Sequence, residues 1–271
     1  EEQIKQYEAD GWVSPVDLLT SEQVAECRSQ LEAWELLRGG SLPAHERSGG
    51  HILFPWIDEL MRADTILNAV EDLIGPNILC WNSVFWIKEA QSSSYVGWHQ
   101  DLQYWGLSNS DVVSIWIALS NASEDAGCMN VIPGSHKETI EHAETYAKNN
   151  LLSRGQELEI DISQRETVPM ALKAGQVSFH HVRPAQGAGP NITNERRNGL
   201  SFHYMPPHTE QTLSEWDCAS LVRGTDQYRH FEHCPQPSAD LEANAVDFHK
   251  RASDAMREII YKGSSTDRRT L

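Results

Sequence analysis

Apolar positions recur with a helical period in three segments of the chain, which are residues 18–40, 64–76 and 242–263. This pattern predicts amphipathic helices that pack one face against a core. Thr20 or Ser21 can cap the first helix, and Gly39 with Gly40 ends it. Asp64 is a potential cap of the second helix, which stops at a Gly-Pro pair.

The chain between the second and third helices has the pattern of short β-strands. Runs rich in β-branched and aromatic residues alternate with turn signals. The main runs are ILCWNSVFWIK, SYVGWHQD, VVSIWIALSN, ELEIDI, TVPMALKAGQVSFHH and RRNGLSFHYMPP. Residues 142–156 are expected to be irregular and partly helical.

This order of elements predicts a mainly β fold, a barrel or jelly roll supported by helices. We expect a single domain over residues 1–271. Its parts are a helical N-terminal part at about 1–75, a barrel core at about 76–207 and a C-terminal helical cover at about 208–271.

Composition narrows the classes of function. With 39 acidic and 22 basic residues, the net charge of −17 argues against a nucleic-acid partner. The chain has no apolar run long enough for a membrane span, and its acidic, polar start does not have the pattern of a signal peptide. Five cysteines without a CxxC pair argue against a disulfide scaffold and favour a reducing, cytoplasmic location. The oligomeric state is left open.

The stretch VGWHQDLQYWGL places His99 two residues before Asp101. In a β-strand, residues i and i+2 point to the same face, so the two side chains are expected to converge on one point. An imidazole and a carboxylate at that point suit iron(II) in a site with open positions. The aromatic residues Trp98, Tyr104 and Trp105 favour a pocket wall over a solvated strand, and the last two are candidates for substrate contact.

Four collinear stretches then make the sequence resemble the phytanoyl-CoA dioxygenase (PhyH) family. They are YEADGWVSPVDLLTSEQV, WHQDLQYWGL, VVSIWIALSNASEDAGCMNVIPGSHK and AGQVSFHHVRPAQGAGPN…ERRNGLSFHYMPP. The resemblance implies a double-stranded β-helix and an iron(II)- and 2-oxoglutarate-dependent oxygenase. It makes His99 and Asp101 two of three iron ligands, Arg197 the partner of the co-substrate carboxylate and Trp116 a wall of its pocket.

The arginine assignment also has a physical basis. A guanidinium group binds a carboxylate through two parallel hydrogen bonds and stays charged at any relevant pH. The neighbouring Arg196 competes for this role, but adjacent residues of a strand face opposite ways. Family spacing favours Arg197 as the inward residue, and Arg196 is expected to be a solvated surface charge.

The chain departs from the family pattern at Gln186, where the resemblance implies a histidine as the third iron ligand. Three interpretations compete. Another histidine replaces it, the amide oxygen of Gln186 itself binds the metal, or the metal site is disabled, by nature or by design. An amide oxygen is neutral, as a metal-bound imidazole is, but it is a weaker ligand for iron(II). The intact pocket favours Gln186 as a metal-site residue.

Three histidines are candidates for the replacement. His181 is five positions before Gln186 and lies on the opposite face of an extended strand. His180 has the right parity but would be roughly 20 Å away at about 3.3 Å per residue. His203 lies on the following strand, where parity does not exclude it.

We therefore expect an oxygenase that uses iron(II), 2-oxoglutarate and O₂ to hydroxylate a small or medium organic molecule. Asp101 points to hydroxylation, because related halogenases have a small residue at that place. The alternatives are a non-catalytic small-molecule-binding barrel with an impaired metal site, and a cupin-like isomerase or metal-binding protein without a co-substrate, which the Arg197 segment disfavours. Lys88 is left as either an anion contact or an edge-strand residue.

Overall fold

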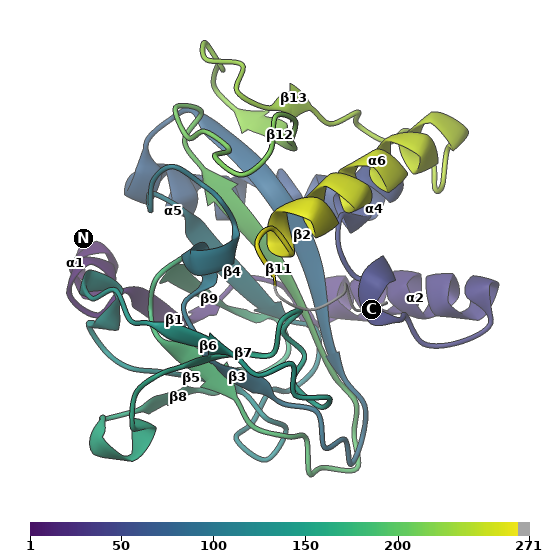
Figure 1. Ribbon diagram of the computed structural model, residues 1–271. Coiled ribbons are helices and arrows are strands. Elements are labelled where there is room, and N and C mark those ends of the chain that lie inside the picture. The colour runs from purple at the N-terminus through teal and green to yellow at the C-terminus, as the bar shows by residue number, and fades with distance from the viewer. Residues whose placement is uncertain (265–271) are drawn as a thin grey trace.

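Antiparallel β-sheet makes up the centre of the computed structural model, which describes residues 1–264, and helices lie on its outside (Figure 1). The large sheet has seven strands in the order β1-β9-β4-β11-β2-β12-β13. Their bounds are β1 Trp12–Asp17, β2 Ile78–Lys88, β4 Val113–Ala118, β9 Gln176–His181, β11 Arg197–Met205, β12 Cys218–Arg223 and β13 Glu232–His233. Neighbours in this sheet are antiparallel except β12 and β13.

A second sheet of four strands has the order β3-β10-β5-β8. Its strands are β3 Val96–His99, β5 Met129–Val131, β8 Val168–Met170 and β10 Gln186–Ala188, and a separate pair consists of β6 His142–Glu144 and β7 Gln156–Leu158. Side chains from the seven-stranded sheet and from the four-stranded sheet line one internal cavity, so these two sheets face each other across it. This arrangement is a jelly roll of the cupin-like kind, and the expected fold class is confirmed.

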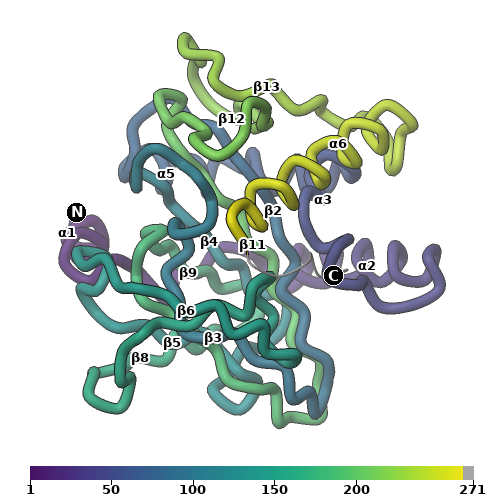
Figure 2. The backbone as a smooth tube through the Cα atoms, viewed as in Figure 1, coloured from purple at the N-terminus to yellow at the C-terminus, as the bar shows by residue number. Residues whose placement is uncertain are grey.

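Six α-helices of the described chain surround the sheets. They are α1 Glu2–Asp10, α2 Ser21–Arg38, α3 Gly50–Leu53, α4 Pro55–Met61, α5 Asp64–Ile74 and α6 Ala243–Ile260. The main core lies between the large sheet and helices α2, α4 and α5, with residues such as Leu31, Ile57, Ile66 and Phe202. The backbone trace in Figure 2 shows α6, in yellow, on the same side of the molecule as β2 and β11.

Local sequence signals explain the elements that were predicted well. Thr20 forms a capping box with Gln23 at the start of α2, and Gly39 ends that helix in the left-handed conformation that favours glycine. In α5, Asp64 is the first helical residue and does not act as its cap. Strand β2 has the predicted bounds, and it is buried on both faces almost throughout.

Other parts of the chain differ from the expectation. Residues 142–156 contain β6 and the first residue of β7, joined by turns, and no α-helix is described there. The large sheet also includes strands from outside the predicted barrel core at about 76–207, since β1 pairs with β9 and β12 pairs with β2. Their sequences carry too few apolar residues in alternation to indicate strands by themselves.

Candidate active site

His99 and Asp101 meet at the end of a strand, not within one. Strand β3 ends at His99, and Asp101 begins a 3₁₀ turn that extends to Tyr104, so the prediction that both residues lie on one strand is wrong. The backbone of Gln100 between them is still extended, with φ −112° and ψ 130°. The i, i+2 geometry therefore holds, and His99 Nε2 lies 3.0 Å from Asp101 Oδ1.

A hydrogen bond to the backbone fixes the orientation of the His99 ring. Its Nδ1 atom lies 2.8 Å from the carbonyl oxygen of Gly97, and a carbonyl can only accept, so Nδ1 carries the proton. In a neutral ring, Nε2 then directs its lone pair at the Asp101 carboxylate. Two such acceptors at 3.0 Å need a proton or a cation between them. This arrangement is typical of a histidine that binds a metal.

Gln186 reaches the same point from the neighbouring strand. It is the first residue of β10 and the register partner of His99, which lies on the adjacent strand β3. Its Nε2 donates to Asp101 Oδ2 at 2.8 Å, while its Oε1 is buried and has no hydrogen-bond partner. A buried amide oxygen without a partner costs free energy unless something binds it. The structure thus brings together the three side chains that the sequence pointed to, and leaves one acceptor open.

Asp101 is the electrostatic centre of this group. Burial opposes its ionisation, but the hydrogen bond and charge of His99, with smaller contributions from His203 and His180, lower the pKa of Asp101 below its ordinary value. The group thus combines an ionised carboxylate, an imidazole nitrogen and an amide oxygen. These are ligands that a first-row divalent metal accepts.

The candidate replacement histidines do not complete a triad. Within residues 1–264, no three His, Cys, Asp or Glu side chains form a group that could hold a metal ion. His181 faces away from the cavity and lies beside Tyr7 and His136. His180 and His203 do line the cavity, which corrects the distance argument for His180. That argument assumed a continuous extended strand, whereas β9 ends at His181 and β10 belongs to the other sheet.

Arg197 and Arg196 diverge as expected from neighbouring strand positions. Arg197 is buried at 3 % exposure, and its Nη1 donates to the carbonyl of Gly127 at 2.9 Å. Its Nε has no partner and its Nη2 has only a 3.5 Å contact with Trp86, so the guanidinium keeps free donors inside a cavity. Burial lowers the pKa of Arg197 to about 10, which leaves it charged at neutral pH.

Arg196 is not the solvated surface charge that the sequence suggested. Both of its terminal nitrogens bond the carboxylate of Glu35 on α2, at 2.5 and 2.6 Å, and its Nε lies 3.1 Å from Glu89. Glu35 is itself buried, and its carboxylate also accepts from the backbone of Leu42. Arg196 thus fastens helix α2 to the sheet, which is a structural role.

Trp116 forms a wall beside the arginine. It lies on β4, lines the cavity, and its ring centre is 5.3 Å from the Arg197 guanidinium carbon. Gly199, two residues after Arg197, makes room for this ring, since a Cβ there would stand 1.9 Å from Trp116 Cζ2. Even alanine at position 199 would displace the indole.

Lys88 is the residue that sequence reasoning left undecided. Strand β2 lies between β11 and β12, so Lys88 is not on an edge strand. It is the register partner of Arg197, and its Nζ donates to the carbonyl oxygens of Gly127, Ala188 and Gly189. Burial first, and then the charge of Arg197, lower the pKa of Lys88 to about 7. A second buried basic group, partly charged at neutral pH, therefore adjoins the arginine.

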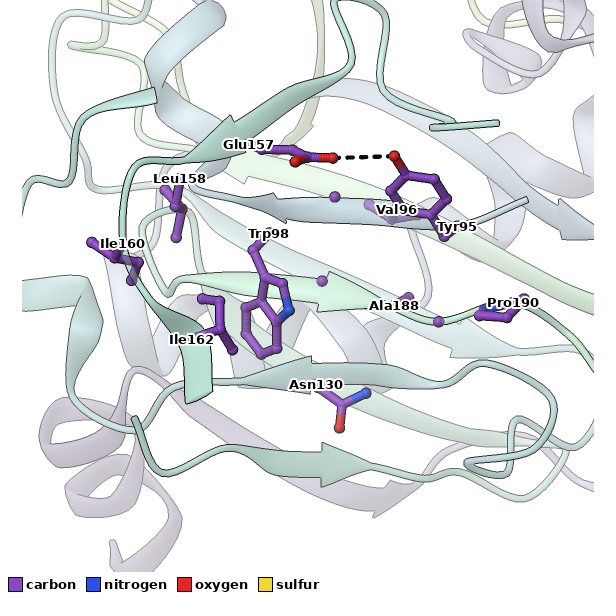
Figure 3. Close-up of a pocket in the computed structure, with 13 residues that line it drawn as sticks. Tyr95, Val96, Trp98, Asn130, Glu157, Leu158, Ile160, Ile162, Ala188 and Pro190 are labelled. Carbon is purple, nitrogen blue, oxygen red and sulfur yellow. Dashed lines mark hydrogen bonds between the residues drawn. The ribbon is translucent and has the colours of Figure 1, made fainter. Parts of the chain in front are cut away.

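The aromatic residues on either side of Asp101 in the sequence lie in two different environments. Tyr104 and Trp105 line a cavity of about 210 Å³ that also opens on His99 and Asp101, as their candidate role requires. Trp98 does not belong to this wall. It packs over Gly187 on the outer face of the small sheet, in a separate groove with Ile160 and Ile162 (Figure 3).

The fold resembles that of a solved non-heme monooxygenase. The sequence profile of the phytanoyl-CoA dioxygenase (PhyH) family matches residues 7–199. The chain belongs to this family, which confirms the resemblance seen in the sequence.

Individual relatives agree with this membership. A probable alpha-ketoglutarate-dependent hypophosphite dioxygenase of Stutzerimonas stutzeri is 34% identical over 158 residues, which cover 57% of this chain and 54% of the relative. The human peroxisomal phytanoyl-CoA dioxygenase is 29% identical over 172 residues, covering 60% of this chain and 47% of the relative. The chain thus spans about half the length of these curated relatives.

Solved structures extend the likeness over almost the whole chain. The non-heme monooxygenase ThoJ, in its apo form, superposes with a TM-score of 0.82 at 30% identity, covering 96% of this chain and 98% of that one. CytC3, at 20% identity and a TM-score of 0.66 over 89% of this chain and 97% of that one, shares the fold. In the described part of the chain, no helix is long and apolar enough to cross a membrane.

Proposed function

We propose that this protein is an iron(II)- and 2-oxoglutarate-dependent dioxygenase that hydroxylates a small or medium organic molecule. One observation carries the proposal. A buried group of His99, Asp101 and Gln186 and a buried arginine with free donors line one cavity. Non-haem oxygenases need these two features together, a ligand set for a divalent metal and an anchor for a dicarboxylate.

The residues fit the metal. His99 Nε2 and the Asp101 carboxylate are the first two ligands, and the unpartnered Oε1 of Gln186 is the third. When Oε1 binds the metal, Nε2 of the same amide can keep its hydrogen bond to Asp101 and so hold the carboxylate in place. Iron(II), when bound, supplies the activation of O₂ that is coupled to decarboxylation of 2-oxoglutarate and oxidation of a C–H bond.

The residues also fit the co-substrate. The free Nε and the weakly bonded Nη2 of Arg197 are donors for the distal carboxylate, and the Trp116 indole covers one side of its chain. Lys88, the register partner of Arg197, adds a basic group next to the arginine. These groups position the co-substrate, and the surrounding walls keep water from it, which is the part of the catalysis that the protein supplies.

The competing proposal is a non-catalytic small-molecule-binding barrel. Anaerobic reconstitution with iron(II), followed by measurement of iron content, separates the two. We expect close to one iron per chain in the wild type, and loss of that iron in Asp101→Ala. A wild type that retains no more iron than Asp101→Ala would contradict the dioxygenase.

Succinate formation from 2-oxoglutarate across a panel of small molecules is the complementary test. We expect wild-type turnover that depends on both iron and one class of substrate, with Gln186→His assayed in parallel. We further propose a cytoplasmic location, based on the five free thiols, four of them buried.

A further inference from the structure

Two cavities meet at the candidate active site, and His203 belongs to both. The first contains Arg197 and Trp116, and the second contains Tyr104 and Trp105. Four residues line both cavities, namely Trp86, His99, Asp101 and His203. His99 and Asp101 have roles in metal binding, which leaves His203 as the polar group at this boundary without an assigned role.

The surroundings of His203 favour a proton on one of its two ring nitrogens. Its Nε2 lies 3.5 Å from the Ser201 hydroxyl, which donates its own proton to the carbonyl of Val84 and accepts from Trp86 Nε1. When Ser201 donates to the Val84 carbonyl, the nearer of its two possible acceptors, it faces Nε2 as an acceptor. Nδ1 lies 2.8 Å from the Ser114 hydroxyl, which can donate to it.

The neutral ring with its proton on Nε2 satisfies both contacts. Burial lowers the pKa of His203 to about 4, which keeps the ring neutral at physiological pH. The 3.5 Å contact with Ser201 is long for a hydrogen bond, so the N–H remains an under-used donor at the boundary of the cavities. The ring cannot turn away easily, because Trp105 packs edge-on against it at 4.6 Å.

The second cavity has the complementary character. Its walls near His203 are aromatic, with Trp81 and Trp105 in contact at 5.0 Å between ring centres and Phe85 and Tyr104 nearby. Its volume of about 210 Å³ accommodates a one- or two-ring body. The lining also includes polar side chains, among them Arg47, Asn82 and Arg257. The aromatic part beside His203 favours flat apolar groups, and the N–H donor there selects for an acceptor at a fixed place.

We propose that His203 is a specificity-determining residue that binds an uncharged oxygen acceptor of the substrate through Nε2–H. The substrate class is then an aromatic or similarly flat apolar compound with a carbonyl, hydroxyl or ether oxygen next to the carbon that reacts. This inference rests on the proposed function, because only an oxygenase would oxidise the bound compound. The binding preference itself needs neither iron nor turnover.

A matched pair of probes tests the preference directly. Acetophenone and α-methylstyrene have the same shape, but only the ketone carries an acceptor oxygen. Dissociation constants are measured by calorimetric titration of the full-length protein without added metal. We expect the wild type to bind acetophenone about tenfold more tightly, since α-methylstyrene leaves the buried N–H unpaired. Equal affinities in the wild type, or no binding of either probe, would overturn the proposal.

Variants test whether His203 causes the preference for acetophenone. His203→Phe keeps the ring and removes the donor, so the two probes are expected to bind equally. Ser114→Ala frees the ring tautomer and is expected to reduce the preference, which guards against a His203→Phe protein that does not fold. Trp105→Leu should weaken both probes alike and leave their ratio unchanged.

The matched control is His181→Phe, on the opposite face of β9, which is expected to leave both constants unchanged. A tenfold preference that survives in His203→Phe would assign the donor elsewhere. Because no metal is added, failure here is distinct from failure of the dioxygenase proposal, which the iron content and succinate assays measure.

Discussion

The two sheets contribute unequally to the candidate active site. The large sheet supplies Arg197 and Trp116, and Gly199 makes room for the indole. The small sheet supplies His99 and carries Gln186, where the resemblance in the sequence implies a histidine. In the proposed site, the large-sheet end thus has the residues that the resemblance implies for the co-substrate, whereas the small-sheet end departs from it at one ligand. The two ends can therefore be tested separately by substitution.

Loss of the arginine is expected to have the largest effect, because it removes the function of the large-sheet end altogether. Arg197→Ala should weaken 2-oxoglutarate binding by roughly 2–5 kcal/mol, since a buried carboxylate loses its charged partner. Anaerobic calorimetry with the iron-loaded protein measures this change.

Arg196→Ala is the control for that experiment. It should lower the free energy of unfolding, because Glu35 then stays buried without its partner, and leave co-substrate affinity near that of the wild type. The reverse outcome, in which only Arg196→Ala loses the co-substrate, would exchange the roles of the two arginines.

A smaller effect is expected at the metal end. Gln186→His should raise iron(II) affinity by about tenfold, or about 1.4 kcal/mol, because imidazole nitrogen is a better ligand than amide oxygen. Gln186→Ala should lower it. Competition with a coloured chelator under anaerobic conditions gives both values. If all three proteins bound iron equally, position 186 would lie outside the metal site.

A further effect concerns the second basic residue of the large-sheet end, and it acts on stability and not on binding. Lys88 has a pKa of about 7 in the folded protein and 10.5 as its ordinary value. Between these values the unfolded chain binds one more proton than the folded one, so Lys88 makes stability increase as pH rises from about 7 to 10. Its contribution is at most about 1.4 kcal/mol per pH unit.

Urea unfolding at pH 7, 8 and 9 tests this dependence. The wild-type curve should rise relative to that of Lys88→Met over this range, whatever the offset between the two proteins. Parallel curves would mean that the folded protein keeps Lys88 charged throughout.

Long, strongly patterned elements could be predicted from sequence because their signals are local. Strand β2 has eleven consecutive residues of strand character, and Thr20 and Gly39 mark both ends of α2. The approach of His99 to Asp101 was also predictable, since i, i+2 geometry depends only on an extended residue between them. The end of the strand at His99 did not disturb it.

The predictions that failed depended on contacts between residues that are far apart in the sequence. Strand β10 has only three residues, and its register with β3 and β5 is a property of the assembled sheet. The distance argument for His180 failed because it did not include the turn that carries the chain from one sheet to the other. The burial of Lys88 was not predictable, because a run of strand residues does not indicate whether the strand is central or at an edge.

Helix α6 has a consequence for how this enzyme class could diversify. Ser253, Met256 and Ile260 of this helix line the aromatic cavity, and so does His203. All four residues lie beyond residue 199, where the family match ends. The cavity therefore has a mixed origin, since its aromatic residues Trp81 and Trp105 lie within the family match and its helical wall lies beyond it. Substitutions on α6 can change the shape of this cavity without touching any residue of the proposed metal site.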